Sequence, residues 1–80
     1  MPTVFRVGPY RFFFFSNEGF EPVHVHVEAG DAYAKLWLDP VSFAEVRRFN
    51  AKQMRQIREV VRERRTEILE AWDEHFRAQD

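Results

Sequence analysis

The segment VHVHVEAGDAYAKLWLDP, residues 23–40, decides the fold, because it contains two alternating segments joined by a turn. Valine alternates with histidine and then glutamate over residues 23–28, and strict alternation is typical of a strand with two different faces. Gly30-Asp31 suits a two-residue hairpin turn. The segment Ala32–Leu38 is then the returning strand, and an Asp-Pro pair ends it. These features predict an antiparallel hairpin.

A turn at Gly30-Asp31 fixes which side chains face one another across this hairpin. One face then consists of apolar pairs: Val27–Ala34, Val25–Leu36 and Val23–Leu38. The other face consists of polar and aromatic pairs: Glu28–Tyr33, His26–Lys35 and His24–Trp37. A three-residue turn would mix the two sets, and a one-residue slip would exchange the faces of a strand. We therefore expect an apolar face for a helix and a second face that carries His24 and His26.

Two more strands are expected before the hairpin. Thr3–Val7 alternates and precedes a Gly-Pro turn, and residues 10–15, YRFFFF, are aromatic and β-prone. Residues 16–22 form a loop by composition, and a loop of seven residues is long enough to carry function. Residues 41–49 are ambiguous, with a short helical turn as one reading.

A helix is expected after Asn50, which suits an N-cap, with the capping-box residue Gln53 three positions later. Apolar residues recur at 3.6-residue spacing through residues 51–77. They are Met54, Ile57, Val61, Ile68, Leu69, Trp72 and Phe76. The sequence therefore predicts one α+β domain spanning residues 1–80. Its fold is a four-stranded antiparallel meander followed by one long C-terminal amphipathic helix packed on one face.

The composition excludes several classes of protein. The chain has 80 residues and no cysteine, so it forms no disulfide and no thiolate zinc site. No apolar stretch approaches the ~18 residues of a membrane span, and there is no signal-peptide pattern. We expect a cytoplasmic protein that does not associate with a membrane.

The charges are unevenly distributed, although the formal net charge is only −1. Residues 47–65 hold eight basic and two acidic side chains. On the predicted helix, Arg55, Arg58, Arg62 and Arg65 project to one flank of the apolar stripe. Repulsion within such a flank would be relieved by phosphate or by an acidic protein. The alternative is a solvated helix face whose arginine stems cover apolar surface.

His24 and His26 have three readings. They could act as general acid and base in a metal-independent ribonuclease, with nearby cations stabilising the phosphorane. They could chelate a divalent metal, although Lys35 beside His26 disfavours a second cation. The further ligands would be Glu18, Glu21 or Asp39. The two histidines could also simply pack beside aromatic neighbours on a half-exposed strand.

The second face also needs a cover, because one helix cannot bury both faces of the sheet. Phe12 and Phe14 point to one face, and Phe13 and Phe15 point to the other. The second face is therefore either a ligand surface with aromatic walls or a protein interface, and a homodimer is one form of such an interface.

The chain resembles a family of small bacterial and archaeal proteins of unknown function, and the segments FFFFSNEG, EPVHVHV and AKLWLDP carry the resemblance most specifically. Members of that family are identified as DhiT-type toxins of type II toxin–antitoxin systems. The resemblance implies a toxin neutralised by a small antitoxin protein, and it supplies no established catalytic residues. Phe15 stands where a tyrosine is common in such proteins.

Together these observations favour a toxin-like protein that acts on RNA or translation. The candidate catalytic residues are His24 and His26. The candidate binding residues are Tyr33, Lys35, Trp37, Arg55, Arg58, Arg62, Arg65, Asn17 and Glu18. The aromatic members would stack a base, and the cations would bind phosphate. The alternatives are a non-catalytic protein- or nucleic-acid-binding module and a His-x-His metal-binding protein. Apart from the divalent metal of that last alternative, no cofactor is expected.

Overall fold

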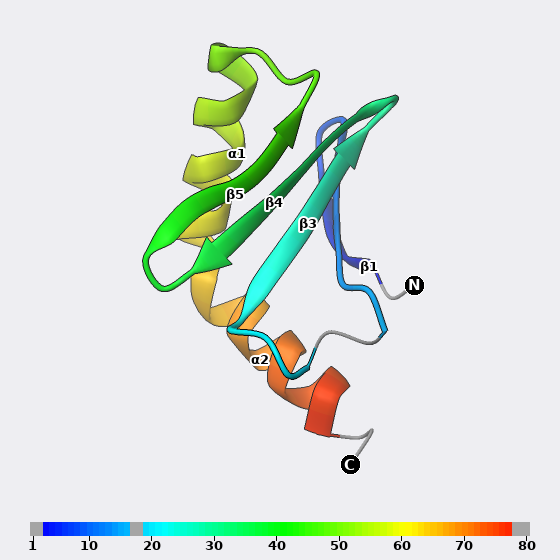
Figure 1. The fold of residues 1–80 in the computed structure, drawn as a ribbon, viewed down its shortest axis with the longest axis vertical. Coiled ribbons are helices and arrows are strands. Elements are labelled where there is room, and N and C mark those ends of the chain that lie inside the picture. Colours follow the sequence, from blue (N-terminus) through cyan, green and yellow to red (C-terminus); the bar gives the residue numbers. More distant parts are fainter. Residues whose placement is uncertain (1–2, 17–18, 78–80) are drawn as a thin grey trace.

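The computed structural model describes residues 3–16 and 19–77, in which an antiparallel sheet is followed by two helices (Figure 1). The strands are β1 (Thr3–Val7), β2 (Tyr10–Phe13), β3 (His24–Ala29), β4 (Ala32–Leu38) and β5 (Val41–Arg47), paired in that order. The helices are α1 (Ala51–Glu63) and α2 (Arg65–Arg77). The α+β class is confirmed and so is the meander order, whereas four strands and a single helix are wrong.

The β3–β4 hairpin has the predicted register. Ala29 pairs with Ala32 across the two-residue loop, and His26 pairs with Lys35. The first loop residue, Gly30, has a φ of 60°, which fits a type II′ turn and favours glycine. The backbone N–H of Leu38 donates to the carbonyl of Val23 at 3.2 Å, which extends the predicted pairing to the end of the hairpin.

Residues 41–47 form the fifth strand, which sequence reasoning left ambiguous. Phe43 pairs with Leu36 and Glu45 pairs with Lys35, so Ala44 is an extra residue in a β-bulge. The bulge shifts the alternation by one position, so that Phe43 and Val46 both pack against the core. Because of this shift, apolar residues do not alternate regularly along the strand, and residues 41–49 therefore show no clear strand pattern in the sequence.

The expected single helix is interrupted at Arg64, whose φ of −107° and ψ of 23° are not helical. The Arg64 N–H still donates to the Val60 carbonyl at 2.9 Å, and the Ile68 N–H donates to the Arg64 carbonyl at 3.0 Å. The chain therefore changes direction between α1 and α2 while most of its hydrogen bonds continue (Figure 1). At the other end of α1, Asn50 and Gln53 form the predicted capping box, with bonds of 2.8 and 2.9 Å.

The helices cover the apolar face of the sheet, and the core lies between the sheet and the helices. Fully buried side chains come from both layers: Phe12, Val25, Val27, Leu36, Ile57, Val61 and Ile68. Polar contacts also join the layers. Tyr10 Oη donates to Gln56 Oε1 at 2.7 Å, and Arg65 Nε donates to the Leu38 carbonyl at 3.0 Å. Within the described residues, no helix is long and apolar enough to cross a membrane.

Replacement of Ile57 by alanine should lower the free energy of unfolding by about 2–5 kcal/mol, because the substitution leaves a cavity at the centre of the core. Urea denaturation followed by circular dichroism measures the change. The exposed Glu59 on the same helix provides the control, since Glu59→Ala should change stability by no more than about 0.5 kcal/mol. Equal effects of the two substitutions would contradict this placement of the core.

Candidate functional site

The face of the sheet opposite the helices carries a row of rings, which we call the aromatic face. It consists of Phe13, Phe15, His24, His26, Tyr33 and Trp37. Ring centroids 4.4–5.5 Å apart join Phe15 to His26, His26 to His24 and His24 to Trp37. The predicted grouping of His24, His26, Tyr33, Lys35 and Trp37 on one face is thus what the structure shows.

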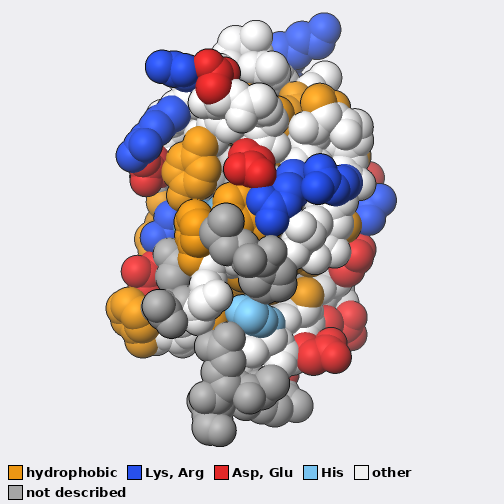
Figure 2. All heavy atoms as spheres, turned by 90° about the vertical axis from the view of Figure 1, so that its right-hand side faces the viewer, with side chains coloured by type: hydrophobic (Ala, Val, Ile, Leu, Met, Phe, Trp, Pro, Cys, Tyr) orange, Lys and Arg blue, Asp and Glu red, His pale blue; other side chains and the backbone are white. Residues whose placement is uncertain are grey.

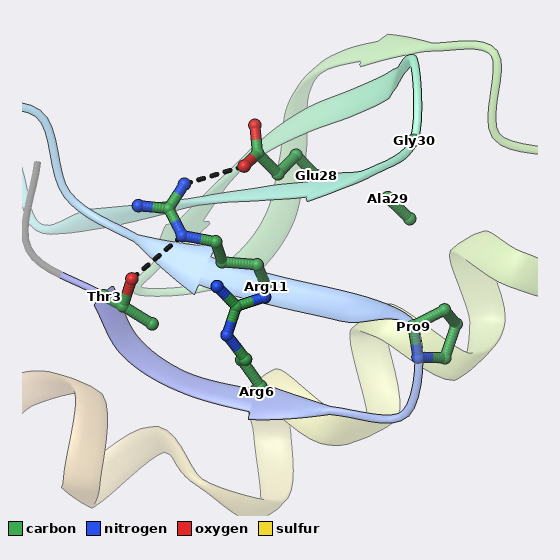
Figure 3. Close-up of a pocket in the computed structure, with 7 residues that line it drawn as sticks. All are labelled: Thr3, Arg6, Pro9, Arg11, Glu28, Ala29 and Gly30. Carbon is green, nitrogen blue, oxygen red and sulfur yellow. Dashed lines mark hydrogen bonds and ion pairs between the residues drawn. The ribbon is translucent and has the colours of Figure 1, made fainter.

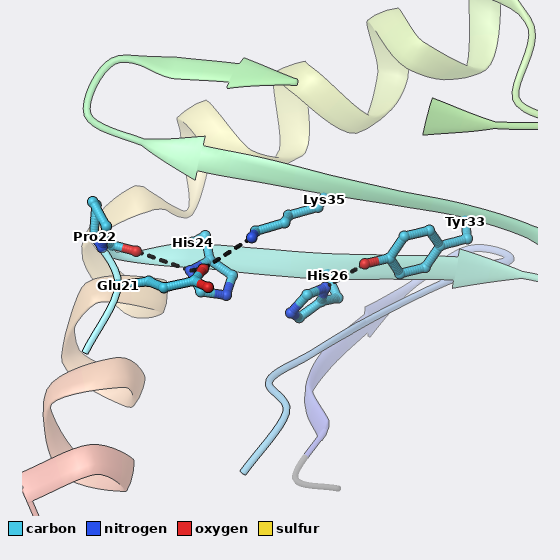
Figure 4. Close-up of polar contacts among 6 residues, drawn as sticks. All are labelled: Glu21, Pro22, His24, His26, Tyr33 and Lys35. Carbon is cyan, nitrogen blue, oxygen red and sulfur yellow. Dashed lines mark hydrogen bonds and ion pairs between the residues drawn. The ribbon is translucent and has the colours of Figure 1, made fainter. Parts of the chain in front are cut away.

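His24 is fully buried, with 0% of its surface exposed. Its Nδ1 lies 2.9 Å from the Pro22 carbonyl oxygen, which can only accept, so Nδ1 carries the proton (Figure 4). The same nitrogen is 3.7 Å from Glu21 Oε1. The Trp72 ring reaches His24 from α2, with centroids 5.0 Å apart, and so α2 closes this end of the aromatic face.

His26 is almost as buried, with 2% of its surface exposed. Its Nδ1 and the Tyr33 hydroxyl are 2.7 Å apart, a short hydrogen bond between neighbouring strands (Figure 4). The Phe13 ring stacks beside the imidazole at 5.4 Å. Burial was not foreseen from the sequence, which indicated a half-exposed strand. Each buried imidazole thus lies close to a more accessible polar side chain, Glu21 for His24 and Tyr33 for His26.

Basic side chains lie over three rings of the aromatic face. The distances to the ring centroids are 4.5 Å for Arg11 on Phe13, 4.6 Å for Lys35 on Trp37 and 5.7 Å for Arg47 on Tyr33. Tyr33 and Trp37 are only partly buried. Figure 2 shows a side of the molecule on which basic side chains lie among acidic and hydrophobic ones. In each of the three contacts, the cation is attracted to the electron-rich face of the aromatic ring.

Carboxylates from neighbouring segments hold two of these cations. Lys35 Nζ donates to Glu21 Oε1 at 2.9 Å (Figure 4), and an Arg11 guanidinium nitrogen donates to Glu28 Oε1 at 2.7 Å. From the sequence, Glu21 was expected only as a metal ligand, and Arg11 was not among the candidate residues. The signal for Arg11 was available, since it alternates with Phe13 and therefore shares its face.

The predicted arginines lie on α1 and at the start of α2, which cover the opposite face of the sheet. Arg58 lies over the Phe43 ring at 5.2 Å, and Arg65 donates to the Leu38 carbonyl, so both mark the boundary of helix and sheet. Arg55 and Arg62 are exposed. Because the sheet separates them from His24 and His26, the predicted site divides into two surfaces.

Asn17 and Glu18, the other two predicted binding residues, lie outside the described residues. Among residues 3–16 and 19–77, no three side chains of the kinds that bind metals are grouped closely enough to hold an ion. The described part of the chain therefore offers the two imidazoles without the further ligands that a metal site requires.

The match to a family model covers the aromatic face. The model is described as "Domain of unknown function (DUF4160)", and it matches residues 10–73. The chain belongs to this family. The matched part of the DUF4160 domain runs from the start of β2 into α2 and leaves out β1. No curated protein and no solved structure matches the chain.

The hydrogen bond between Tyr33 and His26 should couple the two side chains by about 1 kcal/mol, because each positions a polar group of the other in a poorly hydrated site. A double-mutant cycle with Tyr33→Phe and His26→Phe measures this coupling through urea denaturation. A parallel cycle with Tyr10→Phe and His26→Phe is the control, since Tyr10 faces the core and should add within about 0.5 kcal/mol. Additivity in the first cycle would show that the bond does not contribute.

Proposed function

We propose that this DUF4160 protein is the toxin-like component of a toxin–antitoxin pair and that it acts in the cytoplasm by binding RNA on its aromatic face. The observation that carries the RNA part is the set of three cation–π contacts on one face of the sheet. The toxin role and the antitoxin partner rest on the resemblance of FFFFSNEG, EPVHVHV and AKLWLDP to the DhiT-type toxins.

The chemistry of single-stranded RNA fits such a surface. Unpaired bases stack on aromatic rings, and phosphates bind arginine and lysine, so a strand needs both kinds of group at close spacing. Tyr33 and Trp37 are partly accessible, and each has a cation beside it. Lys35 and Arg47 are already paired with Glu21 and Glu45, so the preference for a polyanion rests on accessible rings with cations beside them and not on unpaired charge.

We assign His24 and His26 a positioning role within this proposal. A general acid or base must come within hydrogen-bond reach of the reacting group, and these rings have 0% and 2% of their surface exposed. His26 instead fixes the Tyr33 hydroxyl, and His24 lies beside the carboxylate that holds Lys35. The proposal includes no cleavage step, and a metal-independent ribonuclease is the alternative that the experiment below distinguishes.

The exposed Arg55 and Arg62 supply a second surface, on the side of the molecule away from the aromatic face. We propose that this flank meets acidic residues of the antitoxin. Charges of opposite sign steer association and raise its rate, so a basic helix flank suits a small acidic partner.

The two lysines of the chain provide a matched test of the RNA surface. Lys35→Gln should weaken binding of single-stranded RNA by about three- to tenfold and lower the slope of log affinity against log salt by about 0.7, since one phosphate contact is lost. Lys52→Gln, on the exposed first turn of α1, should leave both quantities unchanged. Fluorescence anisotropy with a labelled oligoribonucleotide measures both. Equal behaviour of the two variants would contradict the assignment.

Induction of the protein in a bacterial host without an antitoxin tests the toxin role. We expect growth arrest by the native protein, weaker arrest by Lys35→Gln, and bulk RNA that stays intact. RNA cleavage that His26→Phe abolishes would favour the ribonuclease instead. Normal growth with the native protein, produced at the same level, would contradict the toxin role.

A further inference from the structure

A second polar feature lies on the same side of the sheet, beside the aromatic face. It is a shallow groove of about 460 Å³ between the β1–β2 and β3–β4 hairpins (Figure 3). Its lining comes from Thr3, Arg6, Pro9, Arg11, Glu28, Ala29 and Gly30. Arg6 belongs to β1, which lies outside the part of the chain that the family model matches.

The register of the strands places two arginines opposite each other in this groove. Arg6 pairs with Arg11 across β1 and β2, and Arg11 pairs with Glu28 across β2 and β3. Like charges that face each other directly on neighbouring strands are destabilising. Among the described residues that line the groove, the only carboxylate is that of Glu28, so these side chains carry one more positive than negative charge.

The Arg11 guanidinium is held in a fixed position. Its Nε donates to Thr3 Oγ1 at 2.9 Å and another nitrogen donates to Glu28 at 2.7 Å (Figure 3). The group also lies over the Phe13 ring, 4.5 Å from the ring centroid. A guanidinium that is already oriented loses little side-chain entropy when it binds a ligand.

Arg6 behaves differently from Arg11. It is exposed, and within residues 3–16 and 19–77 it has no hydrogen-bond or ion-pair partner. In Figure 3 its side chain rises from β1 toward that of Arg11. An anion between the two groups would receive hydrogen bonds from both and would remove their mutual repulsion.

We infer that this groove is a phosphate subsite, in which Arg6 and Arg11 bind one phosphate of an RNA strand whose bases stack on the aromatic face. The inference rests on the proposed RNA-binding function and extends it by naming the direction of the strand, from Trp37 and Tyr33 toward β1. Phe13 connects the two regions, because it belongs to the aromatic face and also supports Arg11. A free phosphate compound shares this chemistry, and the experiment separates the two sources.

The test compares Arg6→Gln with Lys52→Gln, which removes one positive charge from the exposed first turn of α1. Anisotropy with single-stranded RNA should show a three- to tenfold loss of affinity for Arg6→Gln and a salt slope lower by about 0.7, with no change for Lys52→Gln. Pyrophosphate should move the amide NMR signals of β1 and β2 in the native protein, and these shifts should disappear in Arg6→Gln. Urea denaturation should show no loss of stability in either variant.

The outcomes separate the subsite from the proposed function. RNA binding that depends on Lys35 but not on Arg6, with no pyrophosphate shifts, would overturn the subsite and leave the RNA surface in place. Pyrophosphate shifts that depend on Arg6 in a protein that binds no RNA would support the groove as a site for a free phosphate compound and reject the RNA strand. Equal losses in Arg6→Gln and Lys52→Gln would indicate a general charge effect and overturn the inference.

Discussion

The two-residue turn between β3 and β4 is the constraint on which the other features depend. Ala29 pairs with Ala32, and the positive φ of Gly30 allows this tight connection. Because side chains alternate along a strand, the turn determines that the valines face the helices and that His24 and His26 face away from them. One additional loop residue would place imidazoles in the apolar core, where their polar nitrogens would lack the partners they have now.

The composition of the aromatic face could be predicted from the sequence, whereas its burial could not. Alternation and a known turn are local properties, and they were enough to group His24 and His26 with Trp37. The burial of His24 depends on Trp72, which approaches from a helix 48 positions later in the chain. No local pattern shows that α2 continues past the end of the sheet and closes it, since this depends on the change of direction at Arg64.

The predictions of four strands and of a single helix were wrong for the same physical reason. A β-bulge at Ala44 shifts the alternation of β5, and the non-helical Arg64 divides the long helix. Neither position carries the glycine or proline that usually marks an irregularity, so tertiary packing sets the geometry at both sites. The candidate arginines of α1 illustrate the same limit. Helical periodicity placed them correctly on one flank, but only the assembled layers show that a sheet separates that flank from the histidines.

The balance of charge and aromatic area on the aromatic face explains how a sheet face that no helix covers can be stable in the isolated molecule. Two helices cover one face of a five-stranded sheet, so the other face must shield its rings with its own side chains. Cations over Phe13, Tyr33 and Trp37 provide that shielding, and each remains partly hydrated. In the proposed complex, a phosphate would replace water around a cation without disturbing the ring beneath it, and a base would stack on the part of a ring that the cation leaves uncovered. A surface closed by aliphatic side chains would have to open before it could bind RNA, whereas the proposed complex would keep the cation–π contacts that stabilise the free protein.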